Sequence, residues 1–261
     1  MIVNLLPTGW ACIYQQAHAL LASRIGAAWH PAQQPVPTRW VETLAAIAQH
    51  DDGQDPWIGA NGLTPAGAPA SFQLLPFSEA QARRVVAQAR FQGRWRWLLT
   101  SMHTSTLYEP LRGQHGASTD AFLDEQLAMQ AACRKDLNVC KKEAKAAYDL
   151  MQWCDRFSLI LCMQQLPDDA RRLDIGRGPD GRPYQCYRPG LGAGGELVKT
   201  TAPVPVVVEP WPFAADTFEV SVDVSLLTRL TFTDDADLAD ALHTAKIEEW
   251  TWIISRSVRR V

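Results

Sequence analysis

The residues best suited to chemistry are a histidine and an aspartate side by side, His50 and Asp51, which are followed by Asp52 and Gly53. An imidazole nitrogen and a carboxylate oxygen together suit zinc, iron or manganese. The pair follows the apolar residues 40–48, so we expect it near the C-terminal end of a helix that Gly53 terminates. A His-Asp dipeptide also occurs by chance. It is therefore evidence for a metal site only if further ligands come from elsewhere in the chain.

Three other segments place isolated polar groups among apolar neighbours. His18 lies in an Ala- and Leu-rich stretch, His103 follows an apolar run, and Asp155 is the sole carboxylate of residues 150–166. A buried carboxylate is costly unless it is paired or binds a metal. A lone helical histidine is more often a satisfied core residue than a ligand, and Asp155 could pair with an arginine. The order His, His-Asp, His, Asp on successive helices favours one shared site.

The elements that must position these residues are predicted to be helical. Apolar periodicity and capping residues predict helices over residues 15–29, 38–50, 78–91, 94–108 and 118–148, the last with a break near Asn138 and leading into 150–166. Ser78 and Gln81 have capping-box spacing. Residues 53–77 indicate a long irregular loop, and loops of that length are often functional.

The rest of the chain is predicted to be β-rich. Residues 1–14 indicate a hairpin, short β-rich runs cover 184–187, 204–208, 218–224 and 247–254, and a short helix covers 236–246. The C-terminal third could be a separate β domain. We favour one sheet that includes the N-terminal hairpin, since a hairpin alone is too small to be stable. The expected class is α+β in a single domain, 1–261, with a helical half at 15–166 and a β-rich half at 1–14 and 171–261.

Composition excludes several classes of protein. Hydrophobic residues make up 47% and charged residues 20%, which is typical of a folded protein. The net charge of −3 indicates no nucleic-acid partner. No run approaches the roughly 18 apolar residues of a membrane helix, and the first residues lack the pattern of a signal peptide. We therefore expect a cytoplasmic protein without a membrane partner.

Cysteine and glycine patterns carry little functional signal. None of the six cysteines forms a C-x-x-C pair, so we expect buried free thiols instead of disulfides or a zinc knot. Residues 190–195 are glycine-rich, but Pro189 precedes them and no strand-to-helix context surrounds them. We therefore interpret this segment as a hairpin loop and not as a phosphate-binding loop. The ten tryptophans indicate aromatic-rich packing.

Short motifs along almost the whole chain resemble an uncharacterised bacterial family known as a domain of unknown function. The motifs are Met1-Ile2-Val3, Gln16-Ala17-His18-Ala19, His50-Asp51-Asp52-Gly53, Ser101-Met102-His103, Cys154-Asp155-Arg156-Phe157-Ser158-Leu159 and Pro210-Trp211-Pro212-Phe213. The helical half also resembles HD-domain proteins. That resemblance implies that His18, His50, Asp51 and Asp155 bind a divalent metal and that His103 serves a second one. The chain departs from the family at Gln54, where an aromatic residue is expected and Trp57 follows downstream.

Our first functional hypothesis is metal-dependent hydrolysis of a phosphoester in a small molecule such as a nucleotide. One or two ions of Zn, Mn, Mg or Fe would activate water and stabilise charge on phosphate. Asp51 would bridge two metals or orient the water, and Asp52 or His103 would act as general acid or base. Cationic side chains are then expected near the site, from Arg24, Arg94 or Arg96, although surface roles are commoner for arginine.

Two alternatives stay open. A diiron oxygenase of the HD-like type would use His103 as a ligand, with His115 or Asp52 added. A non-catalytic scaffold would bind a ligand or partner through aromatic-rich loops and hold no metal. Metal content separates the three hypotheses.

Overall fold

A computed structural model describes residues 1–52, 62–167, 171–189 and 203–256. Within these ranges the chain forms seven α-helices and one seven-stranded sheet, so the expected α+β class is confirmed. The helices are α1 (Gln15–Ala27), α2 (Trp40–Ala48), α3 (Glu79–Ala89), α4 (Arg94–Tyr108), α5 (Ala117–Leu137), α6 (Lys141–Cys162) and α7 (Asp235–His243). The strands are β1 (Ile2–Leu6), β2 (Gly9–Ile13), β3 (Leu173–Arg177), β4 (Pro183–Tyr187), β5 (Val204–Glu209), β6 (Thr217–Leu227) and β7 (Lys246–Ser255).

The sheet joins the two ends of the described chain in the order β1-β2-β6-β7-β5-β4-β3. All neighbouring strands are antiparallel except β5 and β7, which are parallel. Strand β2 pairs with β6, with Ala11 opposite Leu226, so the N-terminal hairpin belongs to the same sheet as the C-terminal strands. Strand β3 was not predicted from the sequence. The pairing register of β3 shifts between Asp174 and Gly176, and this irregularity interrupts the alternation of buried and exposed side chains that identifies a strand.

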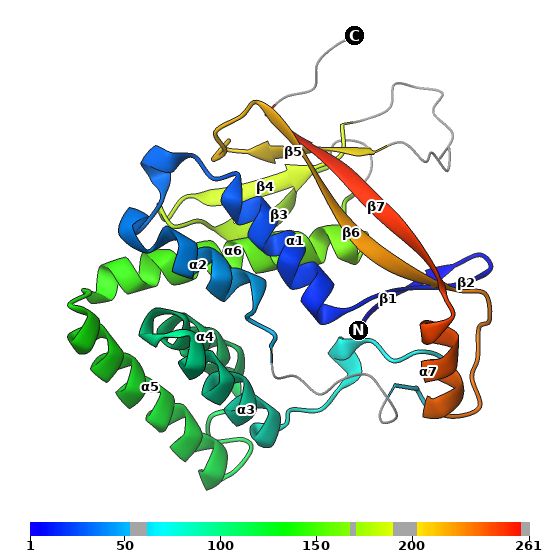
Figure 1. Ribbon diagram of the computed structural model, residues 1–261, viewed down its shortest axis with the longest axis horizontal. Helices are drawn as coiled ribbons and strands as arrows, with labels where there is room; N and C mark the ends of the chain where they lie inside the picture. Colours follow the sequence, from blue (N-terminus) through cyan, green and yellow to red (C-terminus); the bar gives the residue numbers. More distant parts are fainter. Residues whose placement is uncertain (53–61, 168–170, 190–202, 257–261) are drawn as a thin grey trace.

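Figure 1 shows α1 to α6 gathered on one side of the sheet, whereas α7 lies beside the β1-β2 end. Helix α7 packs in a separate small cluster with Met1, Cys12 and Leu227. Helix α1 packs on α6 and on β6, and α6 also packs on β3. Helix α2 packs on α1 and α6, and α4 packs on α2, α3, α5 and α6. The three helices α1, α2 and α6, together with α4, therefore surround one interior region.

Local capping explains where several helices begin and end. The Ser78 side chain accepts a hydrogen bond from the Gln81 backbone N–H at the start of α3, as predicted. Asn138 has φ 52 and ends α5, which confirms the predicted break. Cys140 then caps α6 through a box with Glu143. Cys140 is exposed, which corrects the expectation that all the thiols are buried; the other five cysteines are buried, and all six are free.

An aromatic cluster fixes α1 and α6 against the sheet. Trp29 follows α1 and lies edge-on to Trp153 of α6, with ring centroids 5.1 Å apart. Tyr184 of β4 lies 5.5 Å from Trp153, and Phe213 lies 5.7 Å from Trp29. All four side chains are buried. Since His18 and Asp155 lie on these two helices, this packing sets the distance between them.

Some predicted features lie outside the described residues. These are the glycine-rich residues 190–195 and the rim residues Gln54 and Trp57. None of the described helices has the length and apolar character that crossing a membrane requires.

Candidate metal centre

Four helical segments bring the five predicted ligands together in the interior. His18 lies on α1, His50 and Asp51 directly follow α2, His103 lies on α4 and Asp155 lies on α6. Their side chains form two groups in which the nitrogen and oxygen atoms lie within 4.8 Å of one another. The groups are His18 with His50 and Asp51, and His50 with His103 and Asp155. His50 therefore belongs to both.

The imidazole of His50 is oriented by its own helix. Its Nδ1 lies 2.8 Å from the Ile47 carbonyl oxygen, which can only accept, so Nδ1 carries the proton. Nε2 then points toward two carboxylates, 3.3 Å from Asp155 Oδ1 and 3.5 Å from Asp51 Oδ2. This is the arrangement in which a histidine presents Nε2 as a metal ligand.

His18 is oriented in the same way by a different helix. Ser158 Oγ donates to the Asp155 carbonyl at 2.8 Å and therefore accepts from His18 Nδ1 at 3.0 Å. His18 Nε2 lies 2.9 Å from Asp51 Oδ2. Ser158, which orients the proposed ligand His18, thus lies on α6, the helix that carries the proposed ligand Asp155.

The spacing of these atoms matches ligands that share an ion. With metal–ligand distances of about 2.1 Å, two ligands of one ion lie roughly 3.0–3.4 Å apart in octahedral or tetrahedral geometry. The three nitrogen–oxygen distances that involve Nε2 of His18 or His50 are 2.9, 3.3 and 3.5 Å. Both imidazoles already donate their Nδ1 proton, so at each short contact Nε2 needs either a second proton or a cation.

His103 completes the second group. Its Nε2 lies 4.0 Å from Asp155 Oδ2, and its ring lies edge-on to His50 with centroids 5.1 Å apart. Its Nδ1 is buried and has no hydrogen-bond partner in the described part of the chain. Burial lowers the pKa of His103, which keeps its imidazole neutral at pH 7 and able to bind a cation.

The charges of the centre are strongly coupled. Burial acts to raise the pKa of Asp51 and of Asp155, but the neighbouring histidines, His50 first, outweigh it and lower both. Burial acts to lower the pKa of His50, but the two carboxylates outweigh it and raise that pKa to about 10. A proton on His50 therefore balances the carboxylates, and a divalent cation could take its place.

Arg96 holds the turn that carries the His-Asp pair. Its guanidinium is buried and donates to the Gln49 carbonyl at 3.0 Å and to Asp52 Oδ2 at 3.3 Å, one residue on each side of the pair. Burial lowers the pKa of Arg96 and raises that of Asp52, although each partner opposes the shift. Of the three arginines that were expected near the site, only Arg96 lies beside the centre. Arg24 contacts Ser221, and Arg94 lies near Asp136 at the surface.

The family model of a protein of unknown function, DUF3891, matches residues 1–229 of the 261. The chain belongs to the DUF3891 family. The match covers all five residues of the centre and the strands from β1 to β6. This confirms the expected membership of an uncharacterised family. The DUF3891 description names no activity, so the HD-like resemblance stays a prediction. No curated protein and no solved structure matches the chain.

Sequence reasoning did not assign two side chains of the centre, Ser158 and Gln15. Ser158 orients His18, and Gln15 Nε2 lies 3.4 Å from Asp51 Oδ2. Both lie three residues from a predicted ligand on the same helix, and this spacing could have identified them. Arg96 was one of three arginines expected near the site, but no local signal distinguished it, because its role at the turn depends on contacts between α2 and α4.

Two candidates for an extended ligand set lie apart from the five residues. The Asp52 carboxylate turns toward Arg96. His115 is exposed and packs its ring on Phe77, with centroids 5.8 Å apart. Neither belongs to a group of ligand-type atoms within the described residues.

Proposed function

We propose that this DUF3891 protein is a metal-dependent hydrolase of phosphoesters in small molecules, with nucleotides as the first class to test. The observation that carries the proposal is the orientation of His18 and His50. Each donates its Nδ1 proton to a protein acceptor and turns Nε2 toward a carboxylate at ligand spacing. Such preorganisation is typical of metal-binding histidines.

The donor set fits one or two divalent ions. His18, His50 and Asp51 would hold one ion. His103 and Asp155, together with His50, form the second group that could hold an ion. The unpartnered Nδ1 of His103 and the short contacts at Nε2 of His18 and His50 are the features that a cation would satisfy. Three imidazoles with two carboxylates suit zinc, manganese or iron better than magnesium, which prefers oxygen ligands.

A bound divalent ion supplies an activated water with a pKa near 7 and polarises a phosphoryl oxygen. The residues of the chain supply position and proton transfer. Asp52 lies beside the ligand pair, is partly exposed and has a raised pKa, so its carboxylate can take the proton of the attacking water and pass it to the leaving oxygen. Arg96 keeps that carboxylate in place. His103, if it binds no ion, is the second residue able to hold a proton.

The first test is metal content by elemental mass spectrometry, on protein purified without a metal-affinity step. We expect near-stoichiometric metal in the wild type and its loss in His50→Ala and Asp155→Ala, with folding retained by circular dichroism. His115→Ala is the matched control, because this histidine is exposed and outside the centre. A wild type that stays free of metal after reconstitution with Zn²⁺, Mn²⁺ and Fe²⁺ would overturn the proposal.

The second test is turnover. Protein loaded with zinc or manganese is expected to release phosphate from nucleotides or p-nitrophenol from its phosphate esters, and Asp52→Asn is expected to lower kcat by about 100-fold while metal content is unchanged. Iron as the native metal, with a visible absorption band and no hydrolysis, would instead favour the oxygenase hypothesis.

A further inference from the structure

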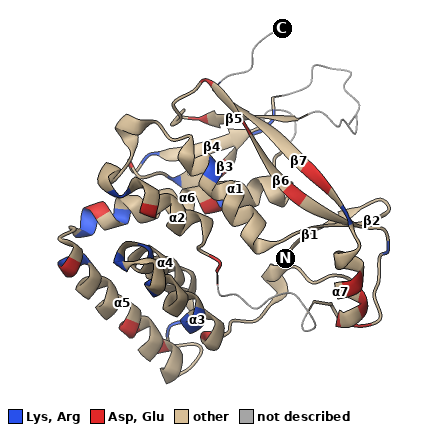
Figure 2. Cartoon of the chain, in the orientation of Figure 1, with Lys and Arg blue, Asp and Glu red and all other residues tan. Residues whose placement is uncertain are grey.

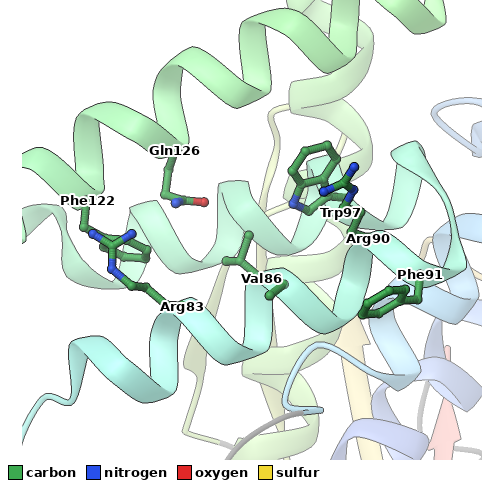
Figure 3. A pocket seen from close by; sticks show the side chains of 8 residues that line it. Arg83, Val86, Arg90, Phe91, Trp97, Phe122 and Gln126 are labelled. Atoms are coloured by element: carbon green, nitrogen blue, oxygen red, sulfur yellow. The ribbon is translucent and has the colours of Figure 1, made fainter.

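A groove lies between α3, α4 and α5 (Figure 3), and none of the five residues of the metal centre lines it. Its volume is about 410 Å³, which is within the usual range of small-molecule pockets. Its main lining residues are Arg83, Val86, Arg90, Trp97, Phe122 and Gln126. None of the residues that line it is a carboxylate. Figure 2 shows the basic residues of α3 that border it.

Each end of the groove has an aromatic ring covered by a guanidinium. Arg83 lies 4.8 Å from the Phe122 ring centroid, and Arg90 lies 5.6 Å from that of Trp97. Figure 3 shows these two pairs on either side of Val86. The two arginines differ in their partners. Arg83 binds the carboxylates of Glu79 and Glu125. Arg90 has no ion pair within the described residues, so its charge is available to a ligand.

Besides Arg90, two side chains that line the groove have a donor without an acceptor in the described part of the chain. Gln126 is buried, and its Oε1 accepts a hydrogen bond from Ser101 Oγ at 3.0 Å. Its amide Nε2 makes no hydrogen bond to the described residues, and Figure 3 shows the amide above Val86 in the groove. Trp97 Nε1 is buried and likewise has no partner in the described part of the chain. A buried donor is normally satisfied, so Trp97 Nε1 indicates a missing acceptor. The Gln126 amide nitrogen faces the groove and can donate to a ligand there.

We propose that this groove binds a small planar anion, an aromatic or conjugated carboxylate. The flat part of the ligand would lie over Val86 between the two rings, where aromatic stacking and apolar burial stabilise it. Its carboxylate would accept hydrogen bonds from Arg90 and from Gln126 Nε2, and charge-assisted bonds of this kind are the strong ones. The proposal concerns binding alone and is independent of the metal centre.

The probe is 1-naphthoate, titrated into the full chain labelled with ¹⁵N-tryptophan. The indole N–H signal of Trp97, assigned by its loss in Trp97→Phe, is expected to shift and to saturate. The neutral analogue 1-naphthalenemethanol is expected to bind at least about tenfold more weakly, because it lacks the charge. Cyclohexanecarboxylate, which keeps the charge without the flat ring, is expected to be weaker as well.

Two variants test the contacts. Arg90→Gln is expected to weaken 1-naphthoate binding about tenfold, and Gln126→Glu is expected to weaken it further because it places a carboxylate opposite the ligand. Arg94→Gln is the control, since it removes a charge from the surface of α4 outside the groove.

Three outcomes would overturn the proposal. Equal affinity for the neutral analogue would show an apolar groove without anion recognition. The absence of a saturable shift at roughly 5 mM probe, a concentration beyond the range of weak specific binding, would show no site. Self-association that depends on Phe91, which is 87% exposed at the end of the groove, would assign this face to a second copy of the chain.

Discussion

Helix α4 contributes to two polar regions that differ in how their charges are balanced. Arg96 and His103 of α4 adjoin the centre. There the imidazole nitrogens lie 2.9–4.0 Å from carboxylate oxygens of opposite charge tendency. Elsewhere on α4, Trp97 adjoins a groove in which the Trp97 indole N–H and the Arg90 guanidinium have no acceptor among the described residues. The centre can therefore balance its charges with a proton until a cation replaces it, whereas the groove needs a ligand that carries the acceptors.

The largest effect that tests this comparison is expected from Asp155→Asn. The variant removes a charge shared by His50 and His103 and keeps the volume of the side chain. We expect metal affinity to fall at least about 1000-fold, or about 4 kcal/mol, in a competition titration against a chelator. Asp149→Asn, on the same helix and paired with Lys145, is the control. Equal affinities in the two variants would show that Asp155 is not a ligand.

Metal affinity is expected to depend strongly on pH. His50 has a pKa raised to about 10 by the two carboxylates, so from pH 6 to pH 8 it holds a proton that a metal must displace. One released proton makes the affinity rise about tenfold per pH unit, or about 100-fold over this range. Isothermal titration of Mn²⁺ in buffers of different ionisation enthalpy counts the released protons. An affinity that does not change with pH contradicts the shared-site geometry.

Arg96→Lys is expected to have the next largest effect. Lysine keeps the charge but cannot hold the Gln49 carbonyl and the Asp52 carboxylate with one planar group. We expect metal affinity to fall about 30-fold, because residues that orient ligands usually contribute 10- to 100-fold. The absorption spectrum of bound Co²⁺ should also change, which a loss of stability alone does not produce. Arg94→Lys should leave both measurements unchanged.

Ser158→Ala is expected to have a smaller effect of the same kind. It removes the acceptor of the His18 Nδ1 proton, so the ring loses its fixed tautomer while the packing of α1 on α6 still holds it in place. Metal affinity should fall about tenfold. Ser158→Thr, which restores a hydroxyl, should recover part of the loss. No difference between the two variants would remove the orienting role of Ser158.

The smallest expected effect is a cross-effect between the two regions. Arg90→Gln should change metal affinity less than about twofold, and Asp155→Asn should change 1-naphthoate binding by no more than that. The reason is that no hydrogen bond or ion pair among the described residues joins the two regions. A larger change in either direction would show that α4 couples them.

Much of the helical half could be predicted because its signals are local. The capping pair Ser78 and Gln81, the break at Asn138 and the lone carboxylate Asp155 can each be read within a few residues. Strand β3 could not be predicted, because it is short, contains Gly176 and bends where its register shifts. Its stability comes from pairing with β4 and from packing on α6, and neither contact leaves a regular alternation in the sequence of β3 itself.

The candidate site divides in the same way. The residue types of the five proposed ligands, and their order on successive helices, were determined by the sequence. The tertiary structure decided which nitrogen of His18 faces Asp51, because its orienting partner Ser158 lies 140 residues away. It also decided that Asp52 turns to Arg96 and that Trp97 faces a groove. Periodicity specifies which face of a helix is buried, but the packing of helices distant in sequence specifies what each buried polar atom meets there.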